Sequence, residues 1–343
     1  MTEAATPVTD DDHTPLLGPG QAVVAFDVGG TDTKSALFDD AGRMLGLKRT
    51  QTPHHAGETA NAVLDLVQEL TARYAIDFPS VDPVAAGLIA PGLVDDDLGI
   101  ALQAANLDWK DVPFKQLVQA RLGLPASFSH DVRAAGEAEF RLGAAQPYRD
   151  VVVIVIGTGL AGSIFIDGRA HIAHGYAGEI GHAIVDPNGF PCSCGARGCL
   201  ETIASAGAIA RRYQSLTGIR PDGARDVLAR AQVGDDAATQ VWESALDSLA
   251  VSIAQLTAFL APEAVVIGGG LAQAGDALFT PLRHRVDELL SFHRRPVLLP
   301  ARIGQNAGLI GAALRARDTV GGPGVTGETR QAESAPSTDK GAA

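Results

Sequence analysis

The chain has 343 residues, of which 46% are hydrophobic and 20% are charged, so it is long enough to bury the cores of two domains. Its formal net charge of −13 opposes binding to a phosphate backbone or to an anionic membrane surface, which argues against a nucleic-acid role. A small-molecule substrate fits this charge better.

The sequence predicts neither a targeting signal nor a membrane span. No apolar run approaches the ~20 residues that a span needs, and the N-terminal segment lacks the basic start and hydrophobic stretch of a secretory signal. All three cysteines lie in one short stretch, which leaves none for a disulfide framework and favours the cytoplasm. Residues 1–20 and 319–343 contain few large apolar residues and are expected to be disordered tails.

The ordered part is expected to begin with a three-stranded meander at residues 22–52, in which a Gly-Gly-Thr turn and an Asp-Asp-Ala-Gly turn separate the strands. The segments predicted next are a helix at 58–74, a strand at 83–90, an amphipathic segment at 112–122, a strand at 126–128 and a helix at 132–142. His130 and Asp131 therefore lie between a strand and a helix, where a side chain can be held rigidly while it faces a cleft.

The opening pattern returns from residue 150, as a strand, a Gly-Thr-Gly turn, a strand, an Asp-Gly turn and a strand. Two copies of one unit, about 130 residues apart, indicate a duplication into two similar domains that face one another. The alternative is coincidence, because glycine turns are common after strands. The elements predicted beyond residue 200 are helices, the longest at 235–260, a strand that ends in three glycines at 264–270, a helix at 276–290, a strand at 297–301 and a helix at 306–317.

The cysteines form a His-x9-Cys-x-Cys-x4-Cys pattern made of His182, Cys192, Cys194 and Cys199. One imidazole and three thiolates are the ligands of a closed tetrahedral zinc site, and the glycines between them let a short loop turn back around the ion. The alternative is that the cysteines pack as small apolar residues. We favour a structural zinc site.

Three glycine turns can bring bare backbone N–H groups close to an anion. They are Gly29, Gly30 and Thr31; Gly157, Thr158 and Gly159; and Gly268, Gly269 and Gly270. Each by itself can serve chain reversal alone, but together they indicate a nucleotide held between two domains. None of them matches the P-loop pattern.

Phosphoryl transfer to a hydroxyl needs a carboxylate that accepts the hydroxyl proton, and Asp131 is the best candidate. Its alternative role is to cap the helix that follows. Glu179 and Glu201 flank the cysteine loop and suit a polyol, although solvent exposure is the usual fate of glutamates. Glu179 and His182 are three residues apart and share one face if this turn is helical, and one His182 nitrogen can bind zinc while the other meets a hydroxyl.

Together these residues resemble the ROK family of sugar kinases and related sugar-responsive repressors, from about residue 21 to residue 318. The motifs that carry the resemblance are Asp27, Gly29, Gly30, Thr31 and Lys34 for the first phosphate motif, Gly157–Gly159 for the second, Gly268–Gly270 for the nucleotide turn, and Glu179-x-Gly181-His182 with Cys192-x-Cys194-Gly195-x-x-Gly198-Cys199-x-Glu201 for the zinc signature. The resemblance implies a two-domain α/β fold of the actin and hexokinase type, which is a duplicated ribonuclease H-like unit with a zinc-binding loop. We expect a small domain at 21–130, to which a helix at 302–318 returns, and a large domain with the zinc loop at 131–301.

The function that the resemblance implies is that of an ATP- and magnesium-dependent glucokinase. Asp131 would accept the proton of the sugar 6-hydroxyl, zinc would be structural, and the chain would form a homodimer or homotetramer. The residues that would hold the sugar are Asn106, His130, Asp131, Glu179, His182 and Glu201. His130 stands where the family usually has Asn.

This departure leaves other hexoses open as substrates, such as N-acetylmannosamine, N-acetylglucosamine or fructose. It also leaves open a catalytically silent sugar-binding protein. Polyphosphate remains an alternative donor, although no basic stripe suited to a polyanion is present. A repressor would need a helix-turn-helix module, and only about 20 residues precede the first predicted strand.

Overall fold

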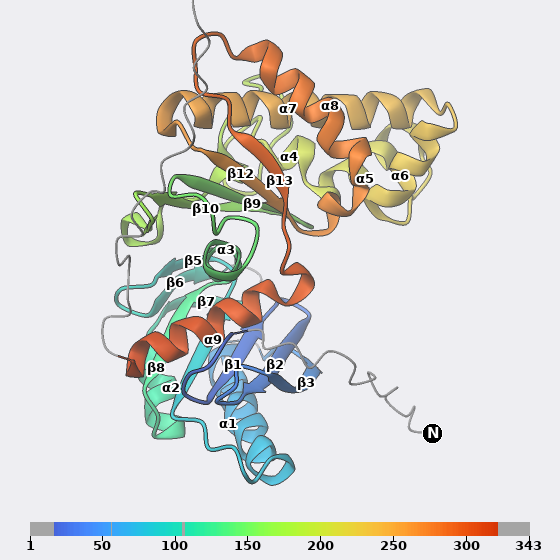
Figure 1. Cartoon of the computed structure of the whole chain (residues 1–343). Coiled ribbons are helices and arrows are strands. Elements are labelled where there is room, and N and C mark those ends of the chain that lie inside the picture. The colour runs from blue at the N-terminus through green and yellow to red at the C-terminus, as the bar shows by residue number, and fades with distance from the viewer. Residues whose placement is uncertain (1–16, 56, 105–106, 322–343) are drawn as a thin grey trace, which may run out of the picture.

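Two five-stranded sheets, one in each half of the molecule, dominate the structure, which is a computed structural model that describes residues 17–55, 57–104 and 107–321 (Figure 1). Among these residues, no helix has both the length and the apolar character that crossing a membrane requires.

The first sheet has the strand order β3-β2-β1-β4-β8. Its strands are β1 (Val23–Val28), β2 (Asp32–Phe38), β3 (Met44–Gln51), β4 (Ala85–Ala90) and β8 (Ala126–His130). The first three strands are antiparallel neighbours, and β1, β4 and β8 are parallel. The carboxyl ends of β1 and β8, where Asp27 and Asp131 lie, therefore meet at one edge of the sheet.

The second sheet repeats this arrangement in the order β11-β10-β9-β12-β13. Its strands are β9 (Val151–Ile156), β10 (Leu160–Ile166), β11 (Arg169–His171), β12 (Ala264–Gly268) and β13 (Val297–Pro300). Again three strands form an antiparallel meander, and β9, β12 and β13 are parallel. The strand orders agree with the repeat that the sequence indicates.

The helices cover the sheets and join the halves (Figure 1). The first half carries α1 (Thr59–Asp77) and α2 (Phe114–Leu122), and the second half carries α4 (Glu201–Ala204), α5 (Ala206–Thr217), α6 (Gly223–Gln232), α7 (Asp236–Leu260) and α8 (Asp276–Leu289). At the junction α3 (Asp131–Leu142) packs against α9 (Ala307–Val320). A small antiparallel sheet of β5 (Leu93–Asp95), β6 (Ile100–Ala104) and β7 (Trp109–Val112) was not expected from the sequence.

Small residues allow α9 to approach its neighbours closely. A Cβ at Gly311 would lie 1.9 Å from the carbonyl oxygen of Ala134 in α3, and a Cβ at Gly87 in β4 would lie 2.0 Å from that of Ala312. Neither position accommodates a side chain. The helix α9 thus follows a strand of the second sheet but packs on the first one.

The predicted tail boundaries are wrong by a few residues at both ends. Leu17 is buried in the core that α9 forms with the first sheet, and Arg317 donates hydrogen bonds to the carbonyls of Gly18 and Gln21. At the other end α9 extends to Val320. Apolar burial and these hydrogen bonds hold both segments, while residues 1–16 and 322–343 lie outside the described residues.

Candidate active site

Asp131 is positioned by the junction of β8 with α3. It is the first residue of α3, and its Oδ1 accepts a hydrogen bond from the backbone N–H of Val132 at 2.7 Å. His130 is the N-cap, and its Nδ1 lies 3.2 Å from the same nitrogen and 3.3 Å from Oδ1 of Asp131. The helix therefore begins one residue earlier than predicted, because His130 supplies the cap that was considered as an alternative role for Asp131.

A cavity of about 460 Å³, here called the junction cavity, brings Asp131 together with residues of both halves. Its lining includes Asp27 from β1, Asp131 from α3 and residues 268–270 after β12. Residues predicted from separate motifs, far apart in the sequence, thus surround one space.

Asp27 is the second carboxylate that faces this space. Burial and, after it, the negative charge of Asp131 raise the pKa of Asp27 to about 6, while the charges of Lys34 and Arg49 offset this only in part. Glu139 also lines the junction cavity, but its two oxygens accept hydrogen bonds from the backbone N–H groups of Ala144 and Ile303. Asp27 and Asp131, rather than Glu139, are available for a ligand.

A second cavity of about 400 Å³, here called the helical cavity, adjoins the first. It lies among α5, α6 and α7 and shares Gly270 and Gln273 with the junction cavity. Asp222, Arg225 and Trp242 line it, and Arg225 donates a hydrogen bond to Gln273 at 2.7 Å. Sequence reasoning missed these residues, because no local motif marks them and the helices that carry them meet only in the fold.

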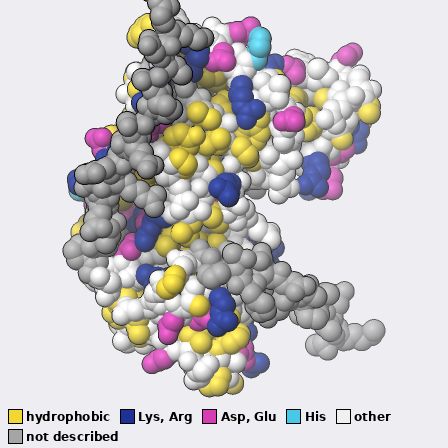
Figure 2. Space-filling view, in the orientation of Figure 1, with side chains coloured by type: hydrophobic (Ala, Val, Ile, Leu, Met, Phe, Trp, Pro, Cys, Tyr) yellow, Lys and Arg dark blue, Asp and Glu magenta, His cyan; other side chains and the backbone are white. Residues whose placement is uncertain are grey.

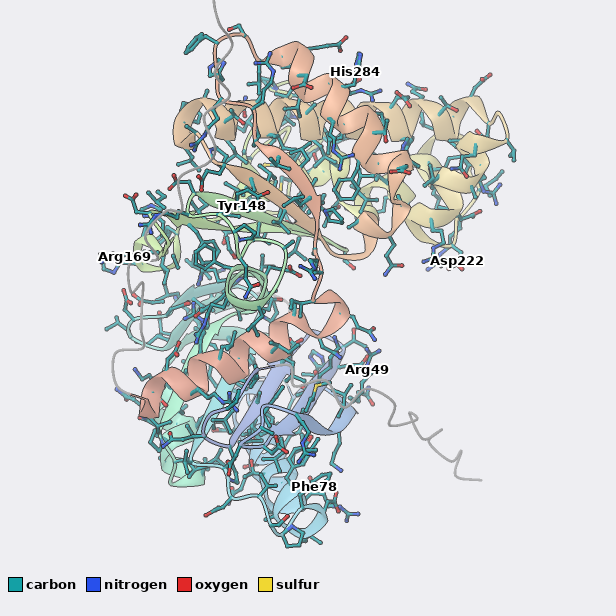
Figure 3. The ribbon with its side chains drawn as sticks, viewed as in Figure 1. Arg49, Phe78, Tyr148, Arg169, Asp222 and His284 are labelled. Atoms are coloured by element: carbon teal, nitrogen blue, oxygen red, sulfur yellow. The ribbon has the colours of Figure 1, made fainter. Side chains whose placement is uncertain are left out.

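The surface is hollowed between the two halves, as Figure 2 shows on the right of its view. Figure 3 labels Asp222 on the second half and Arg49 on the first, each beside this opening. Asp222, which lines the helical cavity, therefore lies at the edge of the hollow.

The other two predicted phosphate turns lie outside the junction cavity's lining. Residues 29–31 connect β1 to β2, and Lys34 on β2 donates a hydrogen bond at 2.8 Å to the carbonyl of Gln305, which does line that cavity. Residues 157–159 connect β9 to β10, and the carbonyl of Gly157 accepts a hydrogen bond from Ala206 at the start of α5.

Glu201 ties the second glycine turn to the cysteine loop. Its Oε2 accepts a hydrogen bond from the backbone N–H of Leu160 at 2.8 Å, and a Cβ at Gly159 would lie 2.7 Å from the same oxygen. Glu201 lines a third cavity, of about 400 Å³, with Cys192 and Arg212. Asp131 is not among the described residues that line this third cavity.

The four predicted metal ligands are close together. The potential ligand atoms of His182, Cys192, Cys194 and Cys199 all lie within 4.8 Å of one another. The Sγ atoms of Cys194 and Cys199 are 3.7 Å apart, and Nδ1 of His182 is 3.5 Å from Sγ of Cys192.

These separations fit zinc. Tetrahedral bonds of ~2.3 Å to sulfur and ~2.0 Å to nitrogen imply separations of about 3.8 Å between two sulfurs and about 3.5 Å between sulfur and nitrogen. Burial and the neighbouring thiols raise the pKa of Cys199 to about 12. This raised pKa applies to the site without a metal. A cation bound among the sulfurs would lower the pKa of the thiols and stabilise the thiolate form, which is the form that binds a divalent ion.

Glu179 and His182 share one face of a turn. Residues Ile180–His182 form a single 3-10 turn, η2, and Nε2 of His182 lies 4.0 Å from Oε2 of Glu179. This confirms the prediction that a helical turn places the two side chains together. His182 presents Nδ1 to the cysteines and Nε2 to Glu179. Asn106, the remaining predicted sugar ligand, lies outside the described residues.

A glycine lets this turn pack against β10. A Cβ at Gly181 would lie 2.0 Å from the carbonyl oxygen of Leu160, so only glycine permits the contact. In the same strand Ser163 donates a hydrogen bond at 2.8 Å to the carbonyl of Val132 in the first turn of α3. The side chain at 163 therefore joins β10 to the helix that carries Asp131.

The chain is similar to known proteins over most of its length. The model of the ROK family matches residues 23–319. A glucokinase of Streptomyces coelicolor is 32% identical over 315 residues, which cover 86% of this chain and 97% of the relative. An N-acetylmannosamine kinase of Yersinia pseudotuberculosis is 32% identical over 301 residues, which cover 87% of this chain and 99% of the relative.

A solved structure shows the same fold. It is that of a ROK family glucokinase from Streptomyces griseus in complex with glucose and AMPPNP. The two chains are 32% identical and superpose with a TM-score of 0.72, over 87% of this chain and 99% of the other.

Proposed function

The chain belongs to the ROK family, and we propose that it is a sugar kinase that transfers the terminal phosphoryl group of ATP to the 6-hydroxyl of glucose. The observation that carries this proposal is the junction cavity, in which the carboxylate of Asp131 from one half faces the glycine turn at 268–270 from the other. A hydroxyl acceptor and a phosphate donor can meet there.

Asp131 is the general base. A carboxylate at the start of a helix is held in a fixed direction, and the bond from Val132 uses only one of its two oxygens. As the phosphoryl group is transferred, the carboxylate accepts the proton of the sugar hydroxyl. The ring of His130 lies beside both this carboxylate and the backbone nitrogen of Val132, and it contacts the sugar.

The nucleotide occupies the two adjoining cavities. Its phosphates lie beside residues 268–270, where no Cβ keeps the backbone N–H groups away, and its base lies in the helical cavity beside Asp222 and Trp242. Gly270 and Gln273 line both spaces, so one extended ligand can occupy them together. The turns at 29–31 and 157–159 close on the phosphates from either side.

Magnesium accompanies the nucleotide. Among the described residues that line the junction cavity there is no lysine or arginine, while Asp27 and Asp131 both face it. A bound Mg²⁺ supplies the positive charge that phosphoryl transfer needs. Asp27 offers the hard oxygen ligand that this ion prefers.

Glu179, His182 and Glu201 hold the remaining sugar hydroxyls, and zinc bound by His182 and the three cysteines fixes the loop that carries them. With Nδ1 directed to the metal, Nε2 of His182 is left for a hydroxyl. The zinc is structural, because four protein ligands complete its coordination.

The test is a coupled ADP assay of the purified protein with a panel of sugars and with ATP or polyphosphate as donor. We expect turnover of glucose with ATP. No transfer to glucose, mannose or N-acetylmannosamine would contradict the kinase proposal. Calorimetry should be run in parallel, since sugar binding without turnover identifies a silent sugar-binding protein.

A kinase for N-acetylmannosamine is the second candidate. It is favoured by the relative from Yersinia pseudotuberculosis, which is as similar in identity as the glucokinase relative, and by His130 beside Asp131, where the contact to the sugar is altered. A kcat/KM for N-acetylmannosamine at least about tenfold above that for glucose would establish it.

A further inference from the structure

Asp96, directly after β5, holds both sides of the segment that contains Asp131. It accepts hydrogen bonds from the hydroxyl of Ser129 at 2.6 Å and from the guanidinium of Arg133 at 2.8 and 3.2 Å. Ser129 lies two residues before Asp131 and Arg133 two residues after it. The side chain of Asp96 is only 2% exposed, so water does not compete for these bonds.

Arg133 extends this contact to the second half of the molecule. Besides Asp96, its guanidinium donates hydrogen bonds to the carbonyls of Val94 at 2.6 Å and Gly175 at 3.2 Å, and it is only 5% exposed. Gly175 ends η1 (Ala173–Gly175), four residues before Glu179. One side chain thus connects the β5 loop, the first turn of α3 and the segment that leads to the proposed sugar ligands.

In the cluster around Asp96, the two carboxylates of Asp96 and Glu137 face the two guanidinium groups of Arg133 and Arg315. Burial acts to raise the pKa of Asp96, but the charges of Arg315 and Arg133 outweigh it and keep that pKa below its ordinary value. Arg315 on α9 lies 3.1 Å from Asp96 and 2.8 Å from Glu137 on α3. Nε of Arg315 is buried and makes no hydrogen bond to the described residues, whereas Asp96 accepts hydrogen bonds from both Ser129 and Arg133. Buried ion pairs of this kind add little net stability, but they can fix the geometry of the segments that they join.

We propose that Asp96 and Arg133 are positioning residues for the phosphoryl transfer, which set the carboxylate of Asp131 at its working distance from the sugar held by the segment after η1. This inference rests on the proposed kinase function. The carboxylate of Asp131 accepts a hydrogen bond from the backbone N–H of Val132 in the same helical turn. The position of this carboxylate therefore depends on the position of the first turn of α3. A displacement of 1 Å at a reacting group costs about a hundredfold in rate.

The first experiment compares Asp96→Asn, Arg133→Lys and the milder Ser129→Ala with the wild type. For Asp96→Asn and Arg133→Lys we expect kcat to fall at least about tenfold while KM for ATP changes less than about twofold. Ser129→Ala leaves every charge in place, and we expect it to fold and to lower kcat about threefold. Arg73→Lys is the matched control, because Arg73 is exposed and pairs with Asp77 at the end of α1. Its kcat should remain at the wild-type value.

The second experiment separates positioning from general support of the fold. Each variant is combined with Asp131→Asn, and rates are expressed per sugar-binding site counted by calorimetry. If Asp96 and Arg133 act through Asp131, they should change the residual rate of Asp131→Asn by less than about twofold. An equal fold-loss in both backgrounds would overturn the inference, and so would wild-type kcat in all three single variants.

The two proposals fail in different ways. A wild-type protein that transfers no phosphoryl group to any sugar contradicts the proposed function. A wild-type protein that is active while its Asp96, Arg133 and Ser129 variants are equally active contradicts only the positioning role.

Discussion

The carboxylate of Glu201 accepts a hydrogen bond at 2.8 Å from the backbone N–H of Leu160. The contact joins Glu201, two residues after Cys199, to the residue that directly follows the turn at 157–159. A change in the cysteine loop is therefore transmitted directly to a proposed phosphate turn.

Replacing Glu201 tests this connection. Glu201→Ala leaves the N–H of Leu160 without its acceptor and removes a proposed sugar ligand, and a hydrogen bond to a charged group is worth about 1.5–3 kcal/mol. We expect kcat/KM for the sugar to fall about ten- to hundredfold. Glu201→Gln keeps a neutral acceptor and should lose less. Steady-state kinetics measure both, and wild-type kinetics for the alanine variant would contradict the role.

Replacing Asp131 tests the general base. Asp131→Asn keeps the shape and the bond from Val132 but cannot accept a proton, so kcat should fall by about 10²–10⁴ while KM for ATP stays nearly constant. The exposed Asp82→Asn is the control for loss of one negative charge. Full activity in Asp131→Asn would remove Asp131 from the mechanism.

The raised pKa of Asp27 predicts a pH dependence of stability. Its ordinary pKa is near 3.9 and its folded value is about 6, so the protonated form favours the fold. This contribution is present below the ordinary pKa and is lost as pH rises through 6, at a cost of about 3 kcal/mol. Asp27→Asn cannot ionise and should avoid the loss.

Urea unfolding at pH 4, 5, 6 and 7, without nucleotide or metal, measures this effect. The free energy of unfolding of Asp27→Asn, relative to that of the wild type, should increase from pH 4 to pH 6 and level off near pH 7. A difference that stays constant over this range would show that burial does not shift Asp27.

Removal of the metal should destabilise the loop at residues 182–201. We expect one zinc per chain by elemental analysis, and we expect a chelator to lower Tm by at least about 5 °C and to abolish sugar binding. Cys194→Ser should reproduce this effect, whereas Ser193→Ala, between two ligands, should not. A protein that is free of zinc and equally stable would contradict a structural metal.

Local features of the sequence determined much of the fold. Glycine turns between apolar strands predicted both meanders, and helical periodicity predicted α7 to within one residue of its observed bounds. The cluster of His182 with the three cysteines was also predictable, because the four residues lie within a short segment whose glycines let it turn back on itself.

Only the tertiary structure determined the remaining features, because these features depend on strand register and on close approach between segments that are far apart in the sequence. The short strands β5 to β7 carry no clear alternation, and the burial of Leu17 depends on α9, which comes from the other end of the chain. The sequence marks Asp131 and the turn at 268–270 as separate motifs, and only parallel strands that end at one junction bring them into a single cavity. Asp96 belongs to no motif, and its bonds to both sides of Asp131 exist only because the fold buries it there.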